Sequence, residues 1–170
     1  EKTAEYIQDL RKDFQDLRVG WERAGKLHLT LKFLGDVDEN QINNLTKAVE
    51  NVVNQIEKFN IQVVGTGQFG KRVLWLGVKD EKANLLKIHN LLKSELEKYG
   101  LAKKTKNFNP HLTIARLREP DKSLQLIKKH LQNEFNTDKF EVSEIIVYES
   151  QLLPTGSTYK KLKIVKIKKF

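Results

Sequence analysis

The alternation of apolar and polar residues predicts a chain that mixes helices with short strands. Apolar residues recur at helical spacing in several stretches, which we expect to form helices: residues 2–17, 38–58, 81–99 and the segment after Asp121. Strict alternation or short apolar runs predict strands at residues 27–33, 59–66, 72–79, 110–115, 140–148 and 159–169, with a turn at Pro154-Thr155-Gly156. This order does not repeat a regular βαβ unit, so the expected fold class is α+β with antiparallel sheets.

The length and the absence of linkers favour one domain over residues 1–170. No apolar run is long enough to span a membrane, and the charged start of the chain has no apolar core of a signal peptide. The chain contains no cysteine, which excludes disulfides, cysteine-ligated zinc and thiol catalysis. We therefore expect a cytoplasmic monomer that does not associate with membranes.

The charge balance is basic, with 31 Lys and Arg against 22 Asp and Glu, a formal net charge of +9. Such an excess favours a polyanionic partner such as RNA, although lysine is also a common solubilising residue, so charge alone leaves both interpretations open. The lysine-rich segment 160–169 could steer RNA or protect an edge strand from aggregation, and we favour the second interpretation.

Two tripeptides share one pattern, His28-Leu29-Thr30 and His111-Leu112-Thr113, and they contain half of the four histidines. Because residues two apart share a face of a strand, each tripeptide would present an imidazole and a hydroxyl on one face and a leucine on the other. The motifs lie 83 residues apart, close to half the chain. We expect two similar lobes, each contributing one motif to a shared cleft.

Two imidazoles and two hydroxyls, without a carboxylate or thiol in the motif, favour phosphoryl chemistry. One neutral imidazole can deprotonate water or a ribose hydroxyl while the other, as imidazolium, protonates the leaving oxygen. Threonine hydroxyls can donate to the phosphate oxygens, and a strained 2′,3′-cyclic phosphate needs little more. A zinc site is the weaker interpretation because no third ligand is near in the sequence. His89 and His130 lack the threonine context, and we interpret them as structural.

The two motifs in their contexts, residues 28–35 and 110–116, resemble the paired H-x-T-x motifs of the 2H phosphoesterases. More narrowly they resemble the LigT-like RNA 2′,3′-cyclic phosphodiesterases, also called 2′-5′ RNA ligases. Residues 72–78 resemble the central strand of that family, and residues 149–159 resemble its C-terminal signature. The resemblance implies a bilobal α+β fold with pseudo-two-fold symmetry, in which two antiparallel sheets flank a central cleft with helices outside.

The resemblance also implies an activity and the residues that carry it. It implies hydrolysis of the 2′,3′-cyclic phosphate ends of RNA to 2′-phosphates, without a metal or other cofactor, and a reverse 2′-5′ ligation. By position His28 is the general acid and His111 the general base, although the two roles could be exchanged, and Thr30 and Thr113 bind the phosphate. Two alternatives stay open: a non-catalytic nucleotide-binding module, and a related 2H phosphodiesterase such as an RNA 3′-exonuclease or a cyclic ADP-ribose phosphodiesterase.

Three further residues are candidates for substrate contacts. Arg116 matches a family arginine expected at the phosphate, but strand parity puts it on the face opposite His111 unless the strand ends or bulges first. Phe108 could stack on a base or belong to the core. Lys32 could meet an RNA phosphate or simply be solvated. The family also begins with a strand, whereas this chain opens in a predicted helix, so either that strand lies outside this sequence or one sheet is a strand short.

Overall fold

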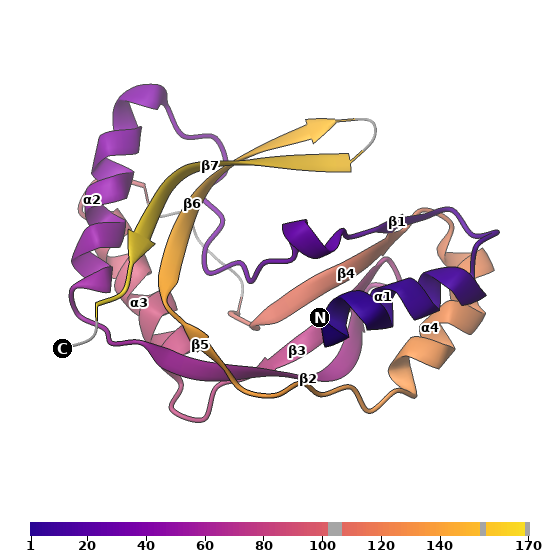
Figure 1. Ribbon diagram of the computed structural model, residues 1–170. Coiled ribbons are helices and arrows are strands. Elements are labelled where there is room, and N and C mark those ends of the chain that lie inside the picture. The colour runs from indigo at the N-terminus through magenta and orange to yellow at the C-terminus, as the bar shows by residue number, and fades with distance from the viewer. Residues whose placement is uncertain (102–106, 154–155, 169–170) are drawn as a thin grey trace. The chain divides into compact units, whose positions relative to one another are not determined.

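The computed structural model describes residues 1–101, 107–153 and 156–168, and it divides into two compact units (Figure 1). Unit 1 comprises Glu1–Thr30, Gln62–Lys79 and Pro110–Lys139. Unit 2 comprises Leu31–Ile61, Asp80–Asn109 and Phe140–Phe170. Each unit is therefore assembled from three separate segments of the chain, and each has its own hydrophobic core.

Antiparallel strands and two helices build unit 1. Its elements are α1 (Lys2–Asp13), β1 (Val19–Trp21), most of β2 (Phe59–Phe69), β3 (Val73–Lys79), β4 (His111–Leu117) and α4 (Leu124–Leu131). The strand order of the sheet is β1-β4-β3-β2-β5, and the start of β2 pairs with β5 (Phe140–Val142) in unit 2. Short 3₁₀ helices, η1 (Ala24–Lys26) and η3 (Pro120–Ser123), precede the first motif and α4.

The core of unit 1 lies between the helices and one face of the sheet. Ile7 and Leu10 of α1, together with Leu126 of α4, pack against the buried strand residues Leu74 and Ile114. The apolar positions three or four apart on each helix supply this contact. Helices α1 and α4 therefore do not cover the opposite face of this sheet.

His130 is fully buried in α4 and serves the structure, as predicted. Its Nε2–H donates to the carbonyl oxygens of Gly67 and Trp75, each at 3.1 Å, and its Nδ1 accepts a hydrogen bond from the hydroxyl of Tyr6 at 2.9 Å. The neutral ring satisfies all three bonds, and burial lowers the pKa of His130. Burial also raises the pKa of Tyr6 to about 12. His130 thus fastens α1, β2 and β3 together.

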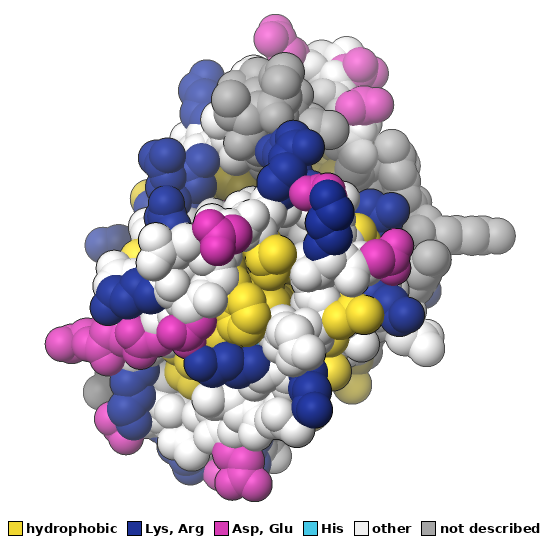
Figure 2. All heavy atoms as spheres, turned by 90° about the vertical axis from the view of Figure 1, so that its right-hand side faces the viewer, with side chains coloured by type: hydrophobic (Ala, Val, Ile, Leu, Met, Phe, Trp, Pro, Cys, Tyr) yellow, Lys and Arg dark blue, Asp and Glu magenta, His cyan; other side chains and the backbone are white. Residues whose placement is uncertain are grey.

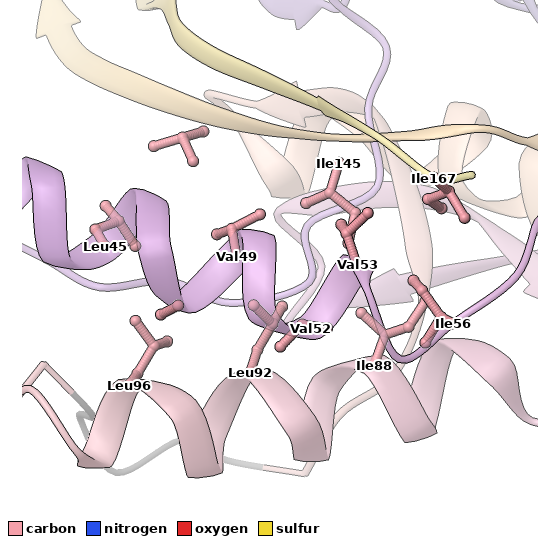
Figure 3. Packing of buried hydrophobic residues seen from close by; sticks show 12 residues of the cluster. Leu45, Val49, Val52, Val53, Ile56, Ile88, Leu92, Leu96, Ile145 and Ile167 are labelled. Carbon is pink, nitrogen blue, oxygen red and sulfur yellow. The ribbon is translucent and has the colours of Figure 1, made fainter.

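Unit 2 packs two long helices against a β-hairpin (Figure 3). Its elements are the 3₁₀ helix η2 (Glu39–Gln41), α2 (Ile42–Val53), α3 (Asn84–Glu97), β5, β6 (Glu144–Leu153) and β7 (Gly156–Lys166). Val49 and Val52 of α2 meet Ile88 and Leu92 of α3, and Ile145 of β6 closes the same cluster. The helical spacing in the sequence predicted that these positions of α2 and α3 would form the apolar face of each helix.

Local signals set the ends of α3. Asp80 accepts a hydrogen bond from the backbone N–H of Leu85 at 2.6 Å and so caps the first turn. Gly100 adopts a left-handed φ of 69°, and the N–H of Leu101 donates to the carbonyl of Leu96 at 2.9 Å. His89, midway along α3, is buried and hydrogen-bonds the carbonyl of Leu31 through Nδ1 at 2.7 Å, which confirms its structural role.

The prediction of a strand over residues 27–33 is wrong. Only Leu29 pairs, in an isolated bridge with Leu112. The apolar alternation has another cause, because Leu27 packs on the core of unit 1 whereas Leu31 packs on the core of unit 2. The sequence also failed to indicate β1, which runs along β4 just before η1 interrupts that edge.

Other differences are smaller. Helix α1 ends at Asp13 rather than residue 17, and Phe14 then packs against the core of unit 1. The predicted turn at residues 154–156 lies largely outside the described residues. No helix in the described part of the chain is long and apolar enough to cross a membrane.

Positive and negative side chains are mixed on the face shown in Figure 2, around a group of apolar side chains. The net charge of +9 is therefore not gathered into one basic patch on this face.

Candidate functional site

Both H-x-T motifs lie in unit 1 and meet through Leu29 and Leu112. These leucines form an antiparallel bridge. Extending the register by one residue on each side sets His28 opposite Thr113 and Thr30 opposite His111. All four side chains then share one face, because the leucines point to the other. Directly opposed Cβ atoms are about 4.5–5.5 Å apart and diagonal neighbours about 7–8 Å, so in this register the two histidines would be diagonal neighbours.

This placement differs from the expectation of one motif in each lobe. The first motif ends at Thr30, the last residue of the first segment of unit 1, and the second lies on β4 in the same unit. The pairing of Leu29 with Leu112 accounts for this, since it attaches the first motif to the edge of β4.

A bulge in β4 brings Arg116 to the face of His111. Leu74 pairs with Ala115 while Trp75 pairs with Thr113, so Ile114 is an extra residue in β4. Both Ile114 and Ala115 are fully buried, whereas Arg116 is exposed. Two consecutive core residues shift the alternation by one position. His111, Thr113 and Arg116 consequently lie on one face. Simple alternation along the strand had put Arg116 on the opposite face, and the bulge removes this difficulty.

A carbonyl group fixes the ring of His28. Its Nδ1 lies 2.8 Å from the carbonyl oxygen of Lys26, the last residue of η1. Since a carbonyl can only accept, Nδ1 must carry a proton. Nε2 is then the atom through which His28 exchanges protons with a ligand, which is the arrangement a general acid or base requires.

Aromatic rings surround His111. The ring of Phe69 packs at 83° to it with a centroid distance of 5.0 Å, and the ring of Trp75 lies at 6.2 Å. Gly77 is opposite His111 in the register of β3 with β4, so no side chain competes for that position. A Cβ atom at Gly67 would lie only 2.1 Å from the Trp75 indole, which shows how closely that ring covers the strand.

Lys32 and Phe108 belong to unit 2, so the structure does not place them with the motifs. Burial lowers the pKa of Lys32, and neighbouring Lys93 adds to this while Glu97 opposes it. Phe108 stacks on His89 with a centroid distance of 4.4 Å and an interplanar angle of 16°. Roles of these two residues at a substrate stay predictions.

Sequence reasoning missed the aromatic surroundings of His111. The sequence indicated Phe69 and Trp75 only as parts of a loop and a buried strand. Two glycines close to strand residues, Gly67 and Gly77, were the available signal, because glycine inside a strand often marks a close approach by another group. No cluster of three or more His, Asp or Glu side chains that could hold a metal ion occurs within residues 1–101, 107–153 and 156–168.

Comparisons with known proteins agree with this fold. The model of the 2′-5′ RNA ligase superfamily matches residues 1–152. A protein of Thermotoga maritima named RNA 2′,3′-cyclic phosphodiesterase is 34% identical over 166 residues, covering 95% of this chain and 85% of the relative. One of the same name from Methanothermobacter thermautotrophicus is 32% identical over 168 residues, covering 95% and 89%.

Solved structures show the same fold. The crystal structure of Escherichia coli LigT complexed with 3′-AMP superposes with a TM-score of 0.69 at 25% identity, covering 97% of this chain and 91% of that one. A second crystal structure, of a protein from Thermus thermophilus, gives a TM-score of 0.74 at 21% identity, covering 97% and 93%.

The chain therefore has a LigT-like α+β fold with antiparallel sheets. It belongs to the 2′-5′ RNA ligase superfamily. This confirms both the resemblance and the fold class that the two motifs indicated.

Proposed function

We propose that this protein hydrolyses the 2′,3′-cyclic phosphate ends of RNA to 2′-phosphates through acid–base catalysis by His28 and His111. The observation that supports the proposal is the Leu29–Leu112 bridge, because side chains next to a bridged pair alternate between faces, and this alternation would bring two imidazoles and two hydroxyls to one face. Several relatives that match most of the chain carry the name of this activity. RNA with a cyclic phosphate end is accordingly the proposed substrate.

The chemistry needs one proton removed and one supplied. His111, as a neutral base, takes a proton from the attacking water, and the new bond forms between the water oxygen and phosphorus. The bond from phosphorus to the 3′-oxygen breaks, and His28, as imidazolium, gives that oxygen a proton through Nε2. Thr30, Thr113 and Arg116 donate hydrogen bonds to the non-bridging oxygens as negative charge grows there.

No step uses a metal ion or other cofactor in this proposal. Each histidine ends the reaction in the protonation state from which the other began, so a proton exchange with solvent restores the site. The same geometry permits the two histidines to exchange roles. With a 5′-hydroxyl as the nucleophile in place of water, the same attack on the cyclic phosphate breaks the bond from phosphorus to the 3′-oxygen and joins two RNA ends by a 2′-5′ bond, as the family name describes.

The test is turnover of a 2′,3′-cyclic mononucleotide in excess EDTA, with the product identified by phosphorus NMR. The proposal expects a 2′-monophosphate to accumulate at an undiminished rate. Nucleotide binding without product would instead identify a binding module. Activity that disappears in EDTA and returns with a metal ion would contradict the metal-independent mechanism.

A further inference from the structure

The tip of the β2–β3 hairpin carries an aromatic residue beside the candidate catalytic centre. Phe69 ends β2 and is 39% exposed, although its ring contacts His111. The turn that follows has positive φ angles at Gly70 (51°) and Lys71 (55°), and the N–H of Arg72 donates to the carbonyl of Phe69 at 3.0 Å. Three residues, 70–72, thus connect Phe69 to Val73, and Phe69 lies at the last paired position of the hairpin.

A second ring supports the first. Trp75 lies 5.3 Å from Phe69 at an interplanar angle of 36°, and it covers the backbone at Gly67. From the other side of the sheet His130 hydrogen-bonds the carbonyls of both Gly67 and Trp75. The indole Nε1 of Trp75 is buried and has no hydrogen-bond partner among the described residues, so packing rather than a hydrogen bond holds this ring.

Positive charge accompanies the two rings. Lys71 and Arg72 are exposed at the tip of the hairpin. In the sheet register Phe69 is opposite Val73, and Val73 is opposite Arg116, so Phe69 and Arg116 belong to one row on one face. Exposed aromatic rings next to a track of cations are what single-stranded nucleic acids bind in proteins.

We propose that Phe69, supported by Trp75, is the stacking site for the nucleobase of the nucleotide that carries the reacting phosphate, with Lys71 and Arg72 beside it for the neighbouring phosphate. This inference rests on the proposed function. Only the ribose separates the base from its 2′,3′-phosphate, so a ring in contact with His111 is within reach of that base. Stacking tolerates every base because each has a π-face, so the site recognises a nucleotide end without selecting its sequence.

Two substrates separate stacking from catalysis. One is adenosine 2′,3′-cyclic phosphate, and the other is methyl β-riboside 2′,3′-cyclic phosphate, which has the same reacting group and no base. Phe69→Leu is expected to lower kcat/KM for the nucleotide by about 5- to 100-fold, mostly through KM, and to leave the value for the methyl riboside nearly unchanged. Phe69→Tyr keeps a stacking ring and is expected to restore the nucleotide activity.

A matched control is Phe140→Leu, since Phe140 is 45% exposed and lies on β5 in unit 2. Phe140→Leu should leave kcat/KM unchanged for both substrates. Equal losses on both substrates in Phe69→Leu would overturn the inference, because the ring would then only position His111. No loss on either substrate would overturn it as well. Failure of the proposed function is distinguishable, since the wild-type protein would then convert neither substrate.

Binding of the product gives a second readout that needs no turnover. Titration with adenosine 2′-phosphate is expected to quench the fluorescence of Trp75 in the wild-type protein, and a Trp21→Phe background removes the other tryptophan. In that background Phe69→Leu should weaken the apparent affinity for the nucleotide and leave the affinity for inorganic phosphate unchanged. Equal weakening for both ligands would contradict stacking.

Discussion

Leu29 and Leu112 form an antiparallel bridge that sets each histidine of one motif opposite the threonine of the other. The two leucines point away from the site, and the four polar side chains around them are related by a local exchange of the motifs. Each row across the bridge then contains one imidazole and one hydroxyl. We propose that this relationship makes the paired motifs a single site.

The symmetry of the bridge predicts similar contributions from the two threonines. Thr30→Val and Thr113→Val keep the shape of the side chain and remove the hydroxyl that would donate to the phosphate. Each is expected to lower kcat/KM by about 10- to 100-fold, because a hydrogen bond to a charged group is lost. Thr→Ser at either position should retain most of the activity. Steady-state kinetics on a cyclic nucleotide check this, and full activity in either valine variant would exclude that residue from the phosphate.

The bulge at Ile114 predicts a functional role for Arg116. Arg116→Met removes the guanidinium and is expected to lower kcat/KM by at least about 10-fold, and Arg116→Lys should restore only part of it because lysine cannot bind two phosphate oxygens in the same way. Arg11→Met is the control, since Arg11 is exposed on α1, which packs on the other face of the sheet. Equal activity of Arg116→Met and Arg11→Met would show that Arg116 is only a surface residue.

The contact between Gly67 and the Trp75 ring predicts a large effect of one methyl group. In Gly67→Ala the new Cβ would lie 2.1 Å from the ring, so the ring must move. We expect the free energy of unfolding to fall by about 1–3 kcal/mol, together with a change in tryptophan fluorescence. Gly25→Ala should change neither quantity, because a Cβ there meets nothing within 4 Å. Chemical denaturation and emission spectra provide the measurement, and unaltered spectra in Gly67→Ala would contradict the packing.

The buried His130 predicts an acid-dependent loss of stability. Burial lowers its pKa below the ordinary value of 6.5, so between that value and its lowered pKa the unfolded chain binds a proton that the folded protein does not. The stabilising effect is complete above pH 6.5 and is lost as the pH falls toward the lowered pKa. His130→Gln should be less stable at neutral pH, but its free energy of unfolding should fall less steeply on acidification. Urea denaturation at several pH values tests this, and parallel curves for both proteins would be the contrary result.

Tyr6 offers the complementary alkaline test. Its pKa is raised from 10.0 to about 12, so the unfolded chain loses the phenolic proton first as the pH rises. The folded protein is therefore expected to lose stability between about pH 10 and 12. Tyr6→Phe removes the ionisable hydroxyl and should flatten that part of the curve while costing the hydrogen bond to His130. An unchanged alkaline slope in Tyr6→Phe would show that other groups determine it.

The sequence predicted the local structure around each motif better than the long-range contacts between distant segments. Strand periodicity correctly put His111 and Thr113 on one face of β4, and helical spacing identified the core positions of α2 and α3. The alternation after Leu27 wrongly predicted a strand. Leu27 packs on the core of unit 1 and Leu31 on the core of unit 2, and the sequence pattern alone cannot distinguish this arrangement from one face of a sheet. The position of Arg116 depends on one extra residue in the pairing of β3 with β4, which no single strand reveals. The aromatic contacts of His111 are equally long-range.

The most direct test of the paired-histidine site compares His28→Ala, His111→Ala and the double variant on a 2′,3′-cyclic nucleotide in EDTA, with circular dichroism to show that each variant is folded. We expect either single substitution to lower kcat by at least about 10²-fold, the lower end of what a positioned acid or base contributes. Because the two groups act on one phosphate as a unit, the double variant should be little worse than the more impaired single variant. Substantial activity in either single variant would contradict the central claim that His28 and His111 form one catalytic site.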